Sequence, residues 1–346
     1  MSIYDEFVTG DGLTLVKAAL DAENSLELYL FGAHITSWVG GGRQRLWMST
    51  ASVMDGSAPL RGGIPLCFPQ FADNGNIKMH GFVREMSWNL VADECSKNED
   101  NLIIVLRLDS DENTDKLWNN SNHPFSLKYT INLSRLGLHI ALQVTNTDLD
   151  HAMQFTNCFH PYFRVEDSSS ITIQGLHGQR FIDKVDKKLE KIQQSVDLNI
   201  FQECEIHGAG TPEYFVDRIY ENCSVNPLTL IQNGVPSLEL TKSPSWRDWV
   251  IFNPWKDGKK GVKGPDFDDD GYIYMICIEP TNAIAPVSLA PNSTAVYAQN
   301  IKVLDVSNQP SQFYPVPKRP RGRPKKRRID STQRDATSGM ITKKKN

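Results

Sequence analysis

An alternation of apolar and polar side chains dominates the central part of the chain. From Phe125 to Leu133 every second residue is apolar, and the same alternation runs from Leu138 to Val144. A period of two places such residues on one face of a β-strand, and residues 134–137 between the two runs are suited to a short turn. The sequence therefore predicts an antiparallel hairpin here.

Other segments predict further strands. Leu26, Leu28 and Leu30 alternate with polar residues, and residues 102–106, LIIVL, form an unbroken apolar run typical of a strand buried on both faces. Helical periodicity is scarce, and residues 184–197 are the best candidate for a short helix. Many strands, turn residues and few helices predict an all-β fold, a large antiparallel β-sandwich.

The periodic pattern stops near residue 306. The chain has 346 residues and is 40% hydrophobic, enough for a large core. Residues 318–346 hold twelve Lys/Arg and two Asp, a net charge of +10, which leaves −14 on residues 1–317. We therefore expect a folded domain over 1–306 and a disordered Pro-, Lys- and Arg-rich tail over 307–346.

The tail contains a short basic motif. Residues 318–328, KRPRGRPKKRR, resemble the core of an AT-hook, in which Arg321, Gly322 and Arg323 would enter a narrow A·T minor groove of DNA. The same run is also typical of a signal read by the nuclear import machinery, or of a solvated tail without a partner. All three interpretations stay open.

Several classes of protein are disfavoured by the sequence. The N-terminus has acidic residues and no apolar core of a secretory signal, and no apolar run has the length of a membrane span. Six scattered cysteines without CxxC pairs predict free thiols in a reducing compartment. We expect a cytoplasmic protein, or a nuclear one if the basic tail directs import, without a membrane partner.

Two arginines enclose a segment rich in Gly and Pro. The segment begins with Arg61 in RGGIPLCFPQF (61–71) and ends with Arg84 in HGFVR (80–84), after His80. Its glycines and prolines disfavour a continuous helix and favour turns and short extended pieces. Such a loop can bring two guanidinium groups and an imidazole to the mouth of a cleft.

Two more segments carry candidate acid and base groups. His160 lies among aromatic residues in NCFHPYF (157–163), where a histidine of the core is the alternative. Glu279 ends an apolar strand in YMICIEP (274–280). Burial there would raise the pKa of its carboxyl and make it a base near neutral pH, and a structural, bonded glutamate is the alternative. GxSxG, Walker A and HExxH motifs are absent.

These motifs, with GLHGQRFIDK (175–184), DRIY (217–220) and IFNPW (251–255), occur in a characteristic order. The chain thereby resembles the hexose-6-phosphate mutarotases, the glucose-6-phosphate 1-epimerase branch of the aldose 1-epimerase superfamily, with CFPQF most like the plant-type branch. The resemblance spans about residues 8–305. It implies a β-sandwich of the galactose-mutarotase type.

The resemblance also implies roles for individual residues. His160 would protonate the ring oxygen of the sugar, and Glu279 would take the proton from the anomeric hydroxyl. Ring opening, rotation about C1–C2 and reclosure then give the other anomer without a metal or redox cofactor. Asp217 would hold sugar hydroxyls, and His80 would bond to or polarise the sugar. Arg61 and Arg84 would hold the phosphate, which planar guanidinium forks suit.

The sequence departs from the family pattern at three places: Met79 replaces a sugar-contacting Gln, residues 270–272 read Asp-Gly-Tyr, and residues 280–286, PTNAIAP, are unusual. These changes bear on substrate preference and on whether activity is retained. The alternative function is a non-catalytic sugar-phosphate sensor brought to chromatin by the tail. Glycoside hydrolysis is disfavoured because the acid–base pair is not two carboxylates. We expect a monomer.

Overall fold

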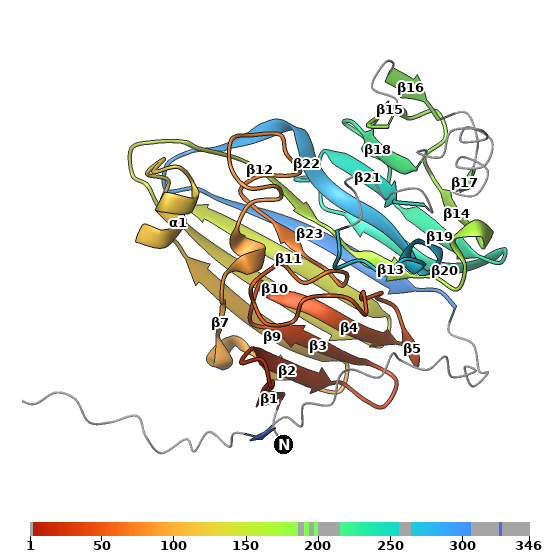
Figure 1. Ribbon diagram of the computed structural model, residues 1–346, viewed down its shortest axis with the longest axis horizontal. Coiled ribbons are helices and arrows are strands. Elements are labelled where there is room, and N and C mark those ends of the chain that lie inside the picture. The colour runs from red at the N-terminus through yellow and green to blue at the C-terminus, as the bar shows by residue number, and fades with distance from the viewer. Residues whose placement is uncertain are drawn as a thin grey trace, which may run out of the picture.

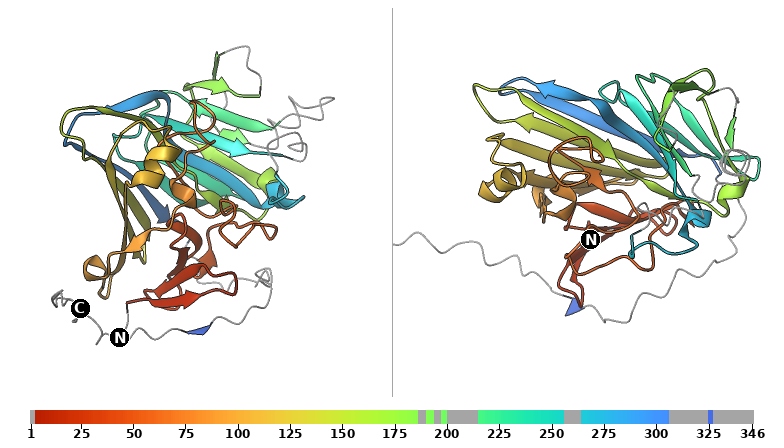
Figure 2. Two further views of the ribbon diagram at one scale, coloured as in Figure 1. Left: turned by 60° about the vertical axis from the view of Figure 1, so that its left-hand side comes forward. Right: turned by 45° about the horizontal axis from the view of Figure 1, so that its top comes forward.

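The computed structural model describes residues 3–185, 190–193, 197–199, 215–255, 264–305 and 325–326. Its strands form three antiparallel sheets of ten, eight and six strands. The ten-stranded and eight-stranded sheets face each other, and the six-stranded sheet lies beside them at the N-terminal end of the chain (Figures 1 and 2). The predicted all-β sandwich is therefore confirmed.

The ten-stranded sheet is the largest of the three. Its strands, in spatial order with β8 beside β9, are β17 (Asp197–Asn199), β14 (Ile171–Gln174), β19 (Leu228–Gln232), β20 (Val235–Lys242), β23 (Thr294–Val303), β11 (Gly137–Asn146), β10 (Phe125–Ser134), β9 (Asn101–Asp109), β7 (Asn89–Leu90) and β8 (Ser96–Lys97).

The eight-stranded sheet carries most of the motif residues. Its strands, in spatial order with β13 beside β22, are β16 (Glu190–Ile192), β15 (Arg180–Asp183), β18 (Val216–Tyr220), β21 (Asp248–Asn253), β22 (Met275–Leu289), β12 (Met153–Phe159), β6 (Leu66–Cys67) and β13 (Tyr162–Arg164).

The six-stranded sheet and a few short helices complete the fold. The sheet has the order β24 (Lys325–Lys326), β1 (Asp5–Val8), β2 (Thr14–Ala19), β3 (Ser25–Tyr29), β4 (His34–Gly40) and β5 (Arg43–Gln44). The helices are α1 (Glu112–Leu117) and the 3₁₀ turns η1 (Val83–Glu85), η2 (Ala92–Glu94), η3 (Ser168–Ser170) and η4 (Gly271–Tyr274). No helix in the described ranges is long and apolar enough to cross a membrane.

The predicted hairpin is confirmed in strand extent and in register. β10 and β11 pair from Phe125 with Asn146 to Ser134 with Gly137. The alternating apolar side chains of both strands are at most 2% exposed and form the centre of the main core. Because side chains alternate across a sheet, the polar partners of these residues cover the outer face.

Two predictions of secondary structure need correction. The LIIVL run lies in β9 as expected, but Ile103 is only partly buried because solvent reaches much of the outer face of that sheet.

Residues 184–197 do not form the expected helix where they are described. They contain β16, whose Ile192 pairs with Arg180 at the edge of β15. The segment has no apolar stripe that a helix could bury, whereas an added strand satisfies the backbone of an exposed edge.

The one α-helix of the described ranges, α1, was not predicted. Asp111 accepts a hydrogen bond from the amide of Thr114, and the hydroxyl of Thr114 accepts one from the amide of Asp111. This reciprocal capping box satisfies amides that a helix of only six residues would otherwise leave without partners. The signal was the spacing of Asp111 and Thr114.

The segment between Arg61 and Arg84 consists of turns and short extended pieces, as predicted. Its backbone lies against the segment after β12. There the amide of His160 donates to the carbonyl oxygen of Pro65, and the amide of Tyr162 donates to that of Gly63. Two motifs that are far apart in the sequence are thereby joined by main-chain hydrogen bonds.

Gly81 provides a test of this arrangement. Its φ is +70°, and a Cβ there would lie 2.1 Å from the carbonyl oxygen of Phe68. We expect Gly81→Ala to lower the free energy of unfolding by about 2 kcal/mol or more, because strain and a backbone clash add. Gly178→Ala is the matched control, since Gly178 has a φ of +72° and open space around it. Equal losses for both variants in urea unfolding would contradict the close approach.

Some predictions fall on residues that the structure does not describe. Arg321, Gly322 and Arg323 of the basic motif lie outside the described ranges, as does Cys204. The other five cysteines are free thiols, as expected.

Candidate active site

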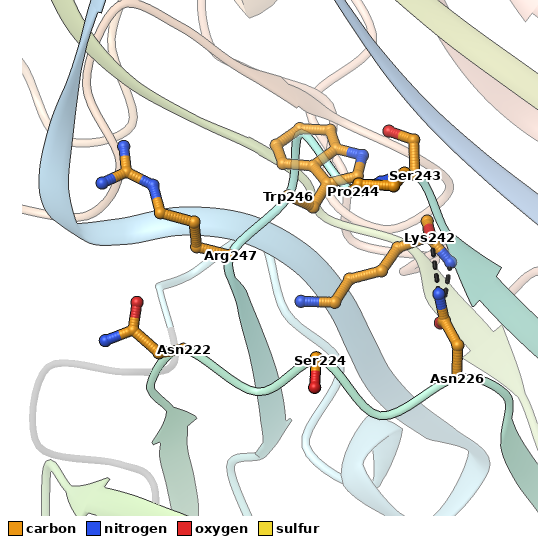
Figure 3. Close-up of a pocket in the computed structure, with 8 residues that line it drawn as sticks. All are labelled: Asn222, Ser224, Asn226, Lys242, Ser243, Pro244, Trp246 and Arg247. Carbon is orange, nitrogen blue, oxygen red and sulfur yellow. Dashed lines mark hydrogen bonds between the residues drawn. The ribbon is translucent and has the colours of Figure 1, made fainter.

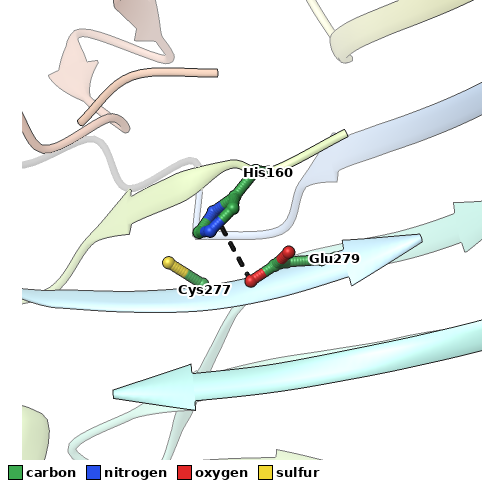
Figure 4. Close-up of side chains that lie close together, drawn as sticks. All are labelled: His160, Cys277 and Glu279. Atoms are coloured by element: carbon green, nitrogen blue, oxygen red, sulfur yellow. Dashed lines mark ion pairs between the residues drawn. The ribbon is translucent and has the colours of Figure 1, made fainter. Parts of the chain in front are cut away.

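Strand β22 supplies the candidate base. Ile276 and Ile278 point into the main core, so the alternation of side chains directs Cys277 and Glu279 to the opposite face of the eight-stranded sheet. Both side chains are buried. Figure 4 shows them directed toward the same space as the ring of His160. The carboxylate at the end of the apolar run is thus placed beside the candidate acid.

His160 directly follows β12, and its ring contacts Tyr162 and Glu279. Its ring stacks on that of Tyr162 with centroids 4.8 Å apart and planes within 6°. Its Nδ1 lies 3.4 Å from Oε1 of Glu279. The geometry of this contact does not make a hydrogen bond, and Nδ1 is buried without one. His160 and Glu279, separated by over a hundred residues in the sequence, are therefore in direct contact.

Burial shifts the proton affinities of this pair in opposite directions. Burial raises the pKa of Glu279 well above its ordinary value, and the Cys158 thiol offsets only part of that rise. Burial also lowers the pKa of His160 well below its ordinary value, and the charges of His80, Arg84 and Arg61 lower it further. Both effects favour the uncharged form of each group. The surroundings therefore bias the pair toward protonated Glu279 and neutral His160.

A pair of thiols connects the candidate base to His80. The Cys158 thiol donates to Oε2 of Glu279 at 3.2 Å. Cys67 lies directly opposite Cys158 in the β6–β12 ladder, and its sulfur is 3.4 Å from Nδ1 of His80. Because Oε2 is engaged by a thiol, Oε1 is the carboxylate oxygen that faces His160.

His80 lies close to His160, as the resemblance implies. Its backbone has a φ of +63°, and the two imidazole rings have centroids 5.4 Å apart. The amide of Ala72 donates to Nδ1 of His80 at 3.2 Å. Since an amide can only donate, Nδ1 is an acceptor, which places the ring proton on Nε2.

Asp217, on β18, belongs to the same electrostatic environment. Burial raises the pKa of its carboxyl, and the charge of Lys184 opposes this, with 3.9 Å between Nζ and Oδ2. The charge of Asp217 in turn raises the pKa of both Glu279 and Cys277. A hydroxyl-rich ligand at this face would find an acceptor here.

Arg61 is held in place by an acidic partner. Its Nε and Nη2 donate to the two carboxylate oxygens of Asp266 at 3.0 and 3.3 Å. Burial alone would lower the pKa of Arg61, but Tyr162 and Asp266 outweigh it and the pKa is raised. The guanidinium is therefore permanently charged, fixed along one edge and 30% exposed.

Arg84 approaches from η1. Its Nη2 donates to the carbonyl oxygen of Met79 at 2.8 Å, while its Nε is buried without a hydrogen-bond partner. Both Arg84 and Arg61 lower the pKa of His160 through their charge. The structure thus brings together all six residues that the sequence singled out: Arg61, His80, Arg84, His160, Asp217 and Glu279.

Several contributors were missed by the sequence analysis. They are the thiols of Cys67, Cys158 and Cys277, the ring of Tyr162 and the carboxylate of Asp266. Each of the three cysteines lies inside a motif that was already recognised: CFPQF, NCFHPYF or ICIEP. Their position inside these motifs could have identified them from the sequence.

Three of these side chains could also hold a metal ion. One ligand atom each from His160, Cys277 and Glu279 lie within 4.8 Å of one another, and all three residues are buried. Imidazole, thiolate and carboxylate together suit a borderline-soft cation such as Zn²⁺.

A separate pocket of about 320 Å³ opens beside the turn between β20 and β21 (Figure 3). Eight residues line it: Asn222, Ser224, Asn226, Lys242, Ser243, Pro244, Trp246 and Arg247. Burial lowers the pKa of Lys242 to about 8, and its Nζ donates to the carbonyl oxygen of Asp248 at 3.0 Å. This pocket shares no residue with the site around Glu279.

Comparison with known proteins identifies the family of the chain. The chain matches the model of the aldose 1-epimerase family over residues 16–302. A relative from Salmonella typhimurium, provisionally named a glucose-6-phosphate 1-epimerase, is 30% identical over 283 residues, covering 79% of this chain and 85% of the relative. A relative of the same provisional name from Cenchrus ciliaris is 28% identical over 271 residues, 77% of each chain.

Solved structures show the same architecture. The crystal structure of a Salmonella typhimurium protein, provisionally described as a mutarotase, matches with a TM-score of 0.70 at 26% identity, covering 85% of this chain and 91% of that one. A galactose 1-epimerase from Lactobacillus acidophilus matches with a TM-score of 0.61 at 14% identity, over 84% and 94%, which shows the shared fold. The chain belongs to the aldose 1-epimerase family and has the β-sandwich fold of the galactose mutarotases.

Proposed function

We propose that this protein interconverts the α and β anomers of a hexose 6-phosphate, with glucose 6-phosphate as the first candidate substrate. The observation that carries the proposal is the contact between His160 and Glu279, 3.4 Å apart, within electrostatic reach of two arginines. The provisional names of the relatives support the choice of sugar.

The reaction moves two protons between the pair and the sugar. As the phosphorylated sugar binds, its negative charge offsets the charges of Arg61 and Arg84 that lower the pKa of His160. The imidazole can then take the proton of Glu279, which leaves the carboxylate. Glu279 takes the proton from O1 while His160 gives one to O5, and the C1–O5 bond breaks. After rotation about C1–C2 the two transfers reverse and the ring closes as the other anomer.

The other residues bind and orient the sugar. Arg61 and Arg84 hold the phosphate through charge-assisted hydrogen bonds. Asp217 and His80 bond to sugar hydroxyls, and the stacked ring of Tyr162 keeps His160 in its orientation. Positioning of this kind lowers the barrier because the reacting groups meet without further ordering.

Comparison of two sugars tests the proposal. We expect kcat/KM for anomer exchange, measured by NMR, to be much higher for glucose 6-phosphate than for glucose. Similar kcat/KM values for the two sugars would mean that the two arginines do not select a phosphate. The assignment of a phosphorylated substrate would then be wrong, whereas the epimerase reaction itself would not be contradicted.

The pH dependence is a further prediction. When His160 and Glu279 together bind a second proton, Glu279 can no longer accept one from the sugar. The lowered pKa of His160 moves this second protonation below 6.5, the ordinary histidine pKa. We expect the acid limb of kcat/KM well below pH 6.5. Since the raised pKa of Glu279 keeps the first proton bound, activity persists as pH rises above 4.5, the ordinary glutamate value.

The substrate phosphate itself titrates near about pH 6, so the profile should be repeated with unphosphorylated glucose. An acid limb centred at or above 6.5 with both sugars would contradict the burial of His160 in its uncharged form.

A further inference from the structure

We propose that His160, Cys277 and Glu279 form an inhibitory binding site for one thiophilic divalent cation of the Zn²⁺ class. The site lies within the proposed catalytic pair, so that the cation and the acid–base function exclude each other. The binding itself does not depend on the proposed reaction, whereas the inhibition does.

The geometry needs little change to hold an ion. Nδ1 of His160 and Oε1 of Glu279 are 3.4 Å apart. One ligand atom from each of His160, Cys277 and Glu279 lies within 4.8 Å of the other two. Ligand atoms around a tetrahedral Zn²⁺ at ordinary bond lengths lie about 3.4–3.8 Å apart. The nitrogen–oxygen pair already has this separation, and a separation of up to 4.8 Å to the sulfur has to close by at most about 1.4 Å to complete the set.

The surroundings of Nδ1 of His160 independently favour a cation at this place. Nδ1 of His160 is buried and has no hydrogen-bond partner, which is unusual for a buried polar atom. The other oxygen of Glu279 accepts from the Cys158 thiol and fixes the orientation of the carboxylate. A cation between Nδ1, Oε1 and the Cys277 sulfur would satisfy the imidazole without breaking that bond.

The donor set selects the class of cation. A thiolate with an imidazole and a carboxylate favours Zn²⁺, Co²⁺ or Cd²⁺ over Mg²⁺ and Ca²⁺, which prefer oxygen ligands alone. The charges of Arg61 and Arg84 near His160 oppose a cation. The carboxylate of Asp217, which acts on both Cys277 and Glu279, offsets them. Three protein ligands leave a fourth position for water.

Spectroscopic titration with Co²⁺ tests binding directly. Co²⁺ bound to a thiolate gives a charge-transfer absorption in the near ultraviolet that oxygen and nitrogen ligands do not give. For the reduced full-length protein we expect this band to saturate at one ion per chain and to disappear when Zn²⁺ is added. Mg²⁺ in excess should leave the band unchanged.

Single substitutions assign the sulfur ligand. Cys277→Ala should abolish the band and weaken Zn²⁺ binding by about 100-fold or more, since loss of a ligand exceeds the 10- to 100-fold effect of outer contacts. Cys158→Ala is the matched control, because that buried thiol contacts Glu279 but lies outside the trio. Should Cys277→Ala unfold, as judged by circular dichroism, Cys277→Ser replaces it. A band that persists without Cys277, or vanishes without Cys158, overturns the site.

Activity then tests the inhibitory consequence. Zn²⁺ should suppress anomer exchange in the wild type and compete with the sugar phosphate. The rate of Cys277→Ala, compared with its own rate without metal, should not respond to Zn²⁺. A wild type that binds Co²⁺ but shows no exchange at all would refute the proposed function and leave the metal site standing. Exchange that continues at full rate with the ion bound would refute the inhibition.

Discussion

Replacing Glu279 with Gln should remove about 10²- to 10⁴-fold of the enzyme-catalysed rate of anomer exchange, the contribution expected of a positioned acid–base group. The amide keeps the size of the side chain and can still accept the Cys158 bond, but it cannot take the proton from O1. His160→Gln should cause a loss in the same range because ring opening then lacks its acid. The two losses should not add, since each transfer needs the other.

Matched variants separate chemistry from folding. Glu239→Gln on β20 and His139→Gln on β11 make the same chemical changes on strands of the other large sheet and should leave kcat unchanged. If Glu279→Gln lost no more activity than Glu239→Gln, the assignment of the base would be wrong. Binding of the sugar phosphate should survive in both site variants.

The second large effect concerns the phosphate. Arg61→Ala and Arg84→Ala should each weaken binding of glucose 6-phosphate by about 10- to 100-fold, the equivalent of a lost charge-assisted hydrogen bond. Binding of glucose, which has no phosphate, should change little. Calorimetric titration with both sugars measures the difference.

Arg107→Ala provides the control, because Arg107 is an exposed arginine of β9 that pairs with Asp109. Equal losses for both sugars in the Arg61 and Arg84 variants would mean that the arginines act on the structure of the site rather than on a phosphate. Since Arg61 is also held by Asp266, its variant should be checked for an intact fold.

The sequence predicted the strands that alternate cleanly and failed where long-range packing decides. The register of β10 and β11 follows from one apolar face and a short turn. The incorrect helix at residues 184–197 and the partial exposure of Ile103 depend on which edges and faces neighbouring segments cover. Local periodicity does not show which edges and faces of a sheet other segments will cover.

The same limit applies to the site. The six predicted residues were found through motifs. Glu279 lies inside β22 and not at the end of a strand as expected, and burial explains why it differs from an ordinary glutamate. The partner of Arg61, by contrast, is Asp266, 205 positions away. The contacts of the thiols depend on which strands lie beside β22. Neither spacing nor composition predicts such pairs before the topology is known.

The central claim is that this chain accelerates anomer exchange of a hexose 6-phosphate through His160 and Glu279. The most direct test is exchange NMR on glucose 6-phosphate at equilibrium with catalytic amounts of the wild type. We expect an exchange rate above the uncatalysed background that rises in proportion to enzyme concentration. A folded protein that binds the sugar phosphate and leaves its exchange rate at background would contradict it.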